Sequence, residues 1–239
     1  MKADCHVHMA LDGVDWKAAL GRHKNGADEN LVHRILALWK DKGYTYLRDG
    51  GDRFGACRRA KELASEYGIT YRSPGAPLCR KGHYGGFIGE SFEDMRRYAA
   101  LVEGKRRDGA DFVKIMISGL MDFDRFGVLT QPGLEPQQIR EMIHIAHEEG
   151  FSVMAHCNGA RTIETAALAG VDSIEHGAYA DEEALRAMAQ NGTVWVPTLS
   201  AIGNLRGKGR FSEYAVEKIL ESALINVEAF ARMGGLLLW

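Results

Sequence analysis

Residues 152–175 read SVMAHCNGARTIETAALAGVDSIE, and this stretch decides the fold class. The run 152–156 is short and apolar, as expected of a buried strand. Residues 160–169 have the spacing of an amphipathic helix, and Gly170 follows where a left-handed residue would end that helix. A further run at 172–175 predicts a second strand. The order strand, helix, strand indicates a βαβ unit with parallel strands.

The same alternation extends over the whole chain, without a linker or a low-complexity stretch. Short β-rich runs predict eight strands, at residues 3–8, 44–48, 69–73, 112–117, 152–156, 172–175, 193–197 and 236–239. Amphipathic patterns between them predict seven helices, at residues 29–41, 54–67, 92–107, 136–149, 160–169, 182–190 and 213–233. Glycines stand where six of these helices should end, namely Gly43, Gly68, Gly109, Gly150, Gly170 and Gly192.

Eight parallel strands joined by right-handed crossovers favour an α/β fold that closes into a (β/α)8 TIM barrel. The 239 residues are slightly fewer than the roughly 250 of a typical barrel. We therefore predict one barrel domain over residues 1–239. No G-x-G-x-x-G follows the first predicted strand and no G-x-x-x-x-G-K-[ST] occurs, so dinucleotide and nucleotide sites lack support.

Composition excludes several other classes of protein. Thirty Lys plus Arg against 32 Asp plus Glu give a net charge of −2, and the basic residues are dispersed, which argues against nucleic acid as a partner. No apolar run approaches the roughly 18 residues of a spanning helix, and the first residues carry charge unlike a secretion signal. We expect a cytoplasmic protein whose four separated cysteines, Cys5, Cys57, Cys79 and Cys157, are reduced thiols.

Two histidines in the first predicted strand lie one residue apart. In Asp4-Cys5-His6-Val7-His8, the two-residue period of a strand places both imidazoles on the same face. Two neutral imidazoles at a strand end form half of a zinc site. The pair by itself is weak evidence, because histidines also occupy strands as hydrogen-bonded core or surface groups.

Three further predicted strands carry residues of related chemistry. Lys114 lies within the apolar run 112–117, where a buried ammonium group is costly unless it is neutralised or paired. His156 and His176 stand at the ends of the fifth and sixth strands, where barrel enzymes build their active sites. Lys114 could instead extend to solvent, and either histidine could bond backbone carbonyls. Their coincidence on strands one, four, five and six favours a metal site.

This order of H-x-H, Lys, His and His resembles the amidohydrolase superfamily of metal-dependent hydrolases, over nearly the whole chain from Asp4. More narrowly, its imidazolonepropionase-like and prolidase-like branch is similar at four segments: YLRDGG at 46–51, KIMISG at 114–119, AH at 155–156 and EHG at 175–177. The resemblance therefore implies both a barrel fold and hydrolytic chemistry.

For the site, the resemblance implies a binuclear centre. His6 and His8 would bind the more buried ion, His156 and His176 the more exposed one, and a carboxylated Lys114 would bridge both. A lysine destabilised by burial and by two dications can react with carbon dioxide to give an anionic carbamate. Two divalent ions that share a water lower its pKa, and the bridging hydroxide attacks the substrate carbonyl. Zinc is the default ion for imidazole ligands, with Mn or Fe as alternatives.

The sequence departs from the superfamily pattern at both ends. The family's strand-eight aspartate, which accepts the proton of the bridging water, would lie beyond Trp239, because residues 236–239 (LLLW) carry no acid. We favour a truncated chain, which lacks the end of the eighth strand and the last helix, over an inactive paralogue. Without that aspartate we expect hydrolysis to be severely impaired. The β-sandwich that many members carry before the first strand is also missing.

Loops at the catalytic end supply candidates for substrate binding. In residues 79–86 (CRKGHYGG), His83 and Tyr84 could stabilise the substrate carbonyl or its oxyanion. Arg80, together with Arg206 after the seventh strand, predicts a substrate that bears a carboxylate. Tyr179 lies near the same mouth. For each of them, a solvated loop or a packing role stays open.

We therefore predict a metal-dependent amidohydrolase that cleaves an amide or cyclic-amide C–N bond in a small molecule. One alternative is a catalytically inactive metal-binding barrel. Another is a hydrolase of esters or phosphoesters, or a deaminase, with the same metal centre. Neither nucleic acid nor a membrane is expected as a partner, and a homo-oligomer is left open.

Overall fold

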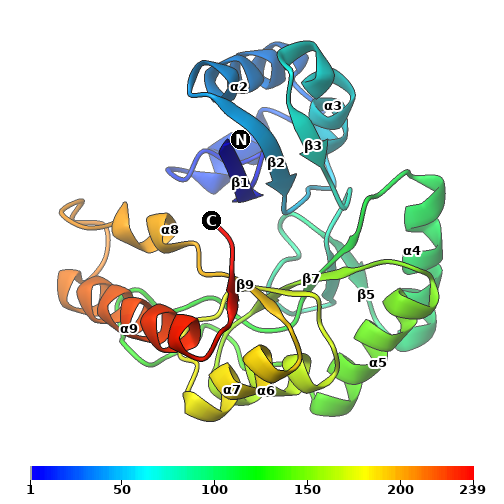
Figure 1. Ribbon diagram of the computed structural model, residues 1–239. Coiled ribbons are helices and arrows are strands. Elements are labelled where there is room, and N and C mark those ends of the chain that lie inside the picture. Colours follow the sequence, from blue (N-terminus) through cyan, green and yellow to red (C-terminus); the bar gives the residue numbers. More distant parts are fainter. Residues whose placement is uncertain (1) are drawn as a thin grey trace. The chain divides into compact units, whose positions relative to one another are not determined.

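Parallel strands alternate with helices in the computed structural model, which describes residues 2–239 (Figure 1). The strands are β1 (Lys2–Val7), β2 (Tyr44–Asp49), β3 (Thr70–Arg72), β4 (Leu78–Arg80), β5 (Glu90–Phe92), β6 (Val113–Met116), β7 (Val153–Cys157), β8 (Ser173–His176), β9 (Val194–Val196) and β10 (Leu236–Leu237). The helices are α1 (Trp16–Gly21), α2 (Glu29–Asp41), α3 (Ala56–Leu63), the 3-10 helix η1 (Ala64–Tyr67), α4 (Met95–Arg107), α5 (Pro136–Glu148), α6 (Ala160–Leu168), α7 (Glu182–Gln190), α8 (Leu199–Gly203) and α9 (Glu213–Arg232). The predicted α/β class with parallel strands is confirmed.

The chain divides into two compact units. Unit 1 contains the residues up to Lys81, residues 85–114 and Trp239, whereas unit 2 contains residues 82–84 and 115–238. The boundary falls inside β6, between Lys114 and Ile115. A single closed barrel over residues 1–239 stays a prediction.

Unit 1 contains a parallel sheet in the order β1-β2-β3. At its centre the fully buried Leu47 is paired with Asp4 of β1 and with Tyr71 of β3. The backbone N–H of Cys5 donates to the carbonyl of Trp239 at 2.9 Å, so the final residue also contacts β1. Strands β4 and β5 form a second parallel pair in this unit.

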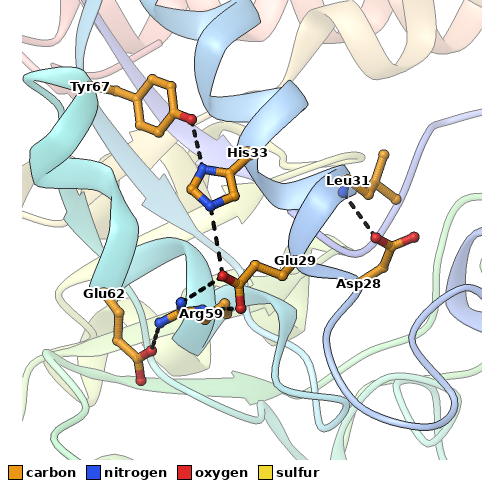
Figure 2. A network of polar contacts seen from close by, with 7 residues as sticks. All are labelled: Asp28, Glu29, Leu31, His33, Arg59, Glu62 and Tyr67. Carbon is orange, nitrogen blue, oxygen red and sulfur yellow. Dashed lines mark hydrogen bonds and ion pairs between the residues drawn. The ribbon is translucent and has the colours of Figure 1, made fainter.

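An exposed polar network joins α2 to α3 and η1 in unit 1 (Figure 2). Arg59 of α3 donates to both carboxylate oxygens of Glu29 on α2, at 2.9 and 2.8 Å, and to Glu62 at 2.6 Å. His33 of α2 bonds the hydroxyl of Tyr67 at 2.7 Å. These contacts fix the two helices to each other at the surface, where ion pairs contribute little to stability.

Unit 2 is built on parallel strands in the order β10-β9-β8-β7. Every residue of β7 is buried, and in β8 only His176 is partly exposed. Such near-continuous burial is typical of parallel strands that helices cover, and α6 and α7 lie side by side in this unit (Figure 1). Within β7 and β8, His176 at a strand end is therefore the one residue that reaches the surface.

The predicted elements agree closely with the observed ones. Each of the eight predicted strands overlaps an observed strand, and each predicted helix contains an observed helix, although 54–67 is divided into α3 and η1. All six predicted helix-ending glycines have positive φ, between 68° and 80°. The short elements α1, α8, β4 and β5 were not predicted, because three to six residues carry too little periodicity.

None of the helices described in residues 2–239 is long and apolar enough to cross a membrane.

Candidate metal centre

In unit 1, His6 lies in β1 and His8 follows it directly. Both are partly buried, and their ring centroids are 5.2 Å apart in an edge-to-face arrangement with an interplanar angle of 68°. The same-face placement expected from the two-residue period of a strand is therefore observed. Within unit 1 both histidines also line a cavity of 490 Å³ that is bordered by Trp39 and Ile35 of α2.

The segment Asp49-Gly50-Gly51 at the end of β2 positions the backbone around His8. The buried Asp49 carboxylate accepts hydrogen bonds from the N–H of Met9 at 2.8 Å and of Gly51 at 2.5 Å. A Cβ on Gly50 would lie 2.4 Å from Cε1 of His8, so only glycine leaves room for that imidazole. At Gly51, φ is +87°, which also requires glycine. These contacts give a physical reason for the DGG sequence.

Asp49 is fully buried beside the hydroxyl of Tyr71, which also donates to it. Burial raises the pKa of Asp49 to about 7, because desolvation penalises the ionised carboxylate more than the donated hydrogen bonds favour it. The neighbouring carboxylate of Asp52 also raises that pKa. Sequence reasoning did not select Asp49 as a functional residue, although it lies within the motif that carries the resemblance.

Lys114 stands in β6, whose four residues are all buried, and its exposed fraction is only 1%. The prediction of a lysine within an apolar strand is therefore confirmed as a placement. A buried ammonium group at such a position is costly unless it is neutralised or paired.

In unit 2, His156 of β7 and His176 of β8 come together at neighbouring strand ends. Their ring centroids are 4.7 Å apart with an interplanar angle of 63°. In the register, His156 pairs with Glu175 and Cys157 with His176, so the two histidines are one residue out of step. His156 is 2% exposed, whereas His176 is partly exposed. The sequence predicted that each histidine ends a strand, and the family resemblance implied that the two form a pair.

A fully buried asparagine organises the surroundings of His156. Asn158 Nδ2 donates to the carbonyl of Gly119 at 3.0 Å, and the same carbonyl lies 3.1 Å from His156 Nε2. Asn158 Oδ1 accepts from the N–H of Ala178 at 3.0 Å, and the Asn158 N–H donates to Ser118 Oγ at 2.8 Å. The side chain thus connects the segments after β6, β7 and β8. Its position two residues after His156, directly after β7, is the signal that could have identified it.

His176 is held from β9. Its Nδ1 lies 2.7 Å from Thr198 Oγ1, and its backbone carbonyl accepts from Trp195 Nε1 at 2.9 Å. A Cβ on Gly177 would lie 2.4 Å from Trp195 Nε1, so glycine is required there. Neither Thr198 nor Trp195 was selected from the sequence.

Of the predicted catalytic residues, Tyr84 lies beside His156. Their ring centroids are 4.6 Å apart at an interplanar angle of 31°. Burial raises the pKa of Tyr84 to about 12, so its hydroxyl is a neutral donor at physiological pH. His83 precedes it in the same partly buried segment, and the carbonyl of Gly82 is held by Gln131 at 3.1 Å.

The predicted substrate-binding residues lie in different settings. Arg80 is the partly buried last residue of β4 in unit 1. In unit 2, Tyr179 has φ of +62° and packs on an apolar cluster that includes Ala178 and Ile202. Arg206 is 54% exposed and donates to Glu217 at 2.5 Å. Within unit 2, the structure therefore brings Tyr84, but not Arg206, into contact with the histidine pair.

Together, parallel strands that alternate with helices define the class of an α/β protein, and histidines stand in pairs at or next to the ends of its strands. A model of the amidohydrolase family matches residues 24–228, and the chain belongs to that family. Ochratoxinase of Aspergillus niger is 32% identical over 243 residues, covering 83% of this chain and 47% of the relative. An uncharacterized protein of Mycobacterium tuberculosis is 29% identical over 216 residues, covering 89% of this chain and 54% of the relative. The chain thus spans about half the length of the curated relatives it matches.

Solved structures share the fold. The crystal structure of A. niger ochratoxinase aligns with a TM-score of 0.79 at 24% identity, over 98% of this chain and 61% of that one. A Xaa-Pro dipeptidase with methionine in its active site aligns with a TM-score of 0.77 at 20% identity, over 98% of this chain and 64% of that one. At these identities the likeness concerns the fold alone.

Proposed function

We propose that the protein is a metal-dependent hydrolase that cleaves a C–N amide bond in a small molecule. Membership of the amidohydrolase family supports this, as does the relative named ochratoxinase. A Xaa-Pro dipeptidase has the same fold. The observation that carries the proposal is the pair His156 and His176, whose rings are in contact at neighbouring strand ends. One ring nitrogen of each histidine is hydrogen-bonded to an oxygen, of Gly119 and of Thr198 respectively. The closed (β/α)8 barrel is part of the proposal, and the likeness to solved hydrolase structures supports it.

The donor set fits divalent metal ions. Metal-binding histidines in proteins bond their second ring nitrogen to an oxygen, as His156 does to Gly119 and His176 to Thr198. Within residues 2–239, no three His, Cys, Asp or Glu side chains are placed to hold an ion, so each histidine pair needs a further ligand. Lys114 can supply one only after carboxylation, because an ammonium group has no acceptor atom.

By the resemblance to the superfamily, the divalent ions would be held by His6 and His8, by His156 and His176, and by Lys114 after carboxylation. Zinc is the proposed metal, with Mn or Fe as alternatives. When bound, such ions lower the pKa of a water molecule and polarise a carbonyl group.

The remaining residues bind and orient the substrate in this proposal. The Tyr84 hydroxyl keeps its proton, since burial raises its pKa to about 12, and can donate it in a hydrogen bond to an oxyanion. His83 is a second donor in the same segment. Arg80 would bind a substrate carboxylate, which the dipeptide and acyl-amino-acid class carries.

Metal analysis of purified variants tests the site. We expect His6→Ala and His176→Ala each to lower the bound zinc, whereas His144→Ala, an exposed histidine on α5, should leave it unchanged. Unchanged metal content in both site variants would overturn the assignment.

Turnover is tested separately with N-acyl amino acids and Xaa-Pro dipeptides, with and without a chelator. Chelator-sensitive release of the amine supports the hydrolase. Metal retention without turnover of amides, esters or phosphoesters would instead support a catalytically inactive metal-binding protein.

A further inference from the structure

Three residues other than glycine have positive φ within residues 2–239, and all lie at the ends of β8 and β9 or just after them. They are His176 at 67°, Tyr179 at 62° and Thr198 at 49°. Such a conformation is costly for a side chain with a Cβ, and most of all for a β-branched residue such as threonine. Backbone strain of this kind persists where the surrounding contacts enforce it, and it is often found at functional sites.

The strained Thr198 and the strained His176 contact each other. Thr198 Oγ1 lies 2.7 Å from His176 Nδ1, a short and well-formed hydrogen bond between residues 22 positions apart. Thr198 directly follows the buried Pro197 just after β9. It stands at the N-cap position of the short helix α8, without a capping hydrogen bond from its side chain. With an extended φ, Thr198 would point its hydroxyl in another direction. The hydrogen bond to His176 therefore depends on the strained backbone conformation.

The backbone of His176 is held from the same strand. Trp195, 1% exposed, donates from Nε1 to the His176 carbonyl at 2.9 Å. Gly177 leaves room for this indole, because a Cβ there would lie 2.4 Å from Nε1. Main chain and imidazole of His176 are therefore oriented by two residues of the β9 end, which makes that end a support for the histidine.

We propose that Thr198 is a positioning residue whose hydroxyl accepts a hydrogen bond from Nδ1–H of His176. This fixes the tautomer in which Nε2 is the atom that binds metal. The inference rests on the proposed function, because it assumes that His176 is a metal ligand. Loss of such an oxygen partner lowers metal affinity about 10- to 100-fold.

Four variants separate positioning from stability. Thr198→Val keeps the shape and removes the hydroxyl, and Thr198→Ser keeps the hydroxyl. Thr198→Gly removes both the hydroxyl and the strain, because glycine adopts positive φ freely. The matched control is Thr193→Val. Thr193 is a buried threonine directly before β9, and its hydroxyl donates to the carbonyl of Val171 at 3.2 Å.

The first readout is the dissociation constant of Zn²⁺, measured by competition with a chelator alongside the free energy of unfolding. We expect Thr198→Val and Thr198→Gly to bind Zn²⁺ about 10- to 100-fold more weakly, although Thr198→Gly should unfold no more easily than wild type. Thr198→Ser and Thr193→Val should bind like wild type. If affinity merely follows stability through the series, or if Thr198→Val binds as tightly as wild type, the inference is overturned.

A second readout needs no metal. In protein labelled with ¹⁵N-histidine, NMR reports which ring nitrogen of neutral His176 carries the proton. We expect Nδ1–H in wild type and Thr198→Ser, with a mixture in Thr198→Val. An Nε2–H tautomer in wild type would overturn the inference, whereas failure of the wild-type protein to bind Zn²⁺ or Co²⁺ would overturn the proposed function.

Discussion

Two polar networks, each containing a histidine, differ in what surrounds them. In the network on α2 and α3, the Glu29 side chain is 52% exposed, and its carboxylate forms an ion pair with Arg59 in contact with solvent (Figure 2). At the ends of β7 and β8, His156 and Asn158 are almost or completely inaccessible. Hydrogen bonds of similar length therefore occur in both places, but only the buried ones lack water as an alternative partner. Burial, rather than residue type, therefore decides how much stability is lost when a hydrogen bond of a polar network is removed.

Among the variants considered, Asn158→Ala, which breaks the buried network, should cause the largest loss of stability. It leaves the N–H of Ala178 without its acceptor and removes the donor to Gly119. We expect a loss of about 3 kcal/mol in the free energy of unfolding, because buried polar groups lose their partners. Urea denaturation measures this. Asn191→Ala, at the exposed end of α7, removes a similar side-chain bond to Ala187 and should change stability far less.

Gly177→Ala should disturb the surroundings of His176 through a backbone position. The new Cβ would meet Trp195 while φ stays near +65°, so the indole must move away from the His176 carbonyl. We expect a loss of about 2 kcal/mol and a change in tryptophan fluorescence. The control is Gly192→Ala, where φ is +68° but the new Cβ would meet no neighbouring atom. This variant therefore introduces the backbone strain without the steric clash. Equal losses in both variants would contradict the role given to Trp195.

Asp49 is a third buried polar group, and the effect of its burial on stability can be measured by varying the pH. Its pKa is raised to about 7 chiefly by burial, while an unfolded aspartate titrates near about 3.9. Between these values the unfolded chain loses the proton first, so the contribution of Asp49 to stability is present below about pH 4 and lost as pH rises to about 7.

Measured by urea unfolding from pH 4.5 to 7.5, the stability of wild type relative to Asp49→Asn should fall with rising pH. A relative stability that rises instead would mean that the hydrogen bonds from Met9, Gly51 and Tyr71 keep the carboxylate ionised.

The smallest effect is expected in the exposed network. Arg59→Gln removes its contacts with Glu29 and Glu62, which water and salt can replace. Thermal unfolding at low salt should show a slight loss of stability that disappears at high salt. A loss as large as that of Asn158→Ala would refute the contrast between the two networks.

Local patterns predicted much of the fold because their physical causes are local. Gly43 and Gly170 end helices since a left-handed residue is needed there, and both have positive φ. His6 and His8 share a face because side chains in a strand alternate. The segments of β4 and β5 were missed because each has three residues and is recognised only by its pairing.

The sequence by itself determined the alternation of strands and helices, the ends of the helices and the strand ends that carry His156 and His176. Only the tertiary structure decided how those histidines are held. Gly119 reaches Asn158 across 39 positions, and Thr198 reaches His176 across 22. Such contacts depend on which strands are neighbours and in what register, and the propensities of individual segments carry no information about either.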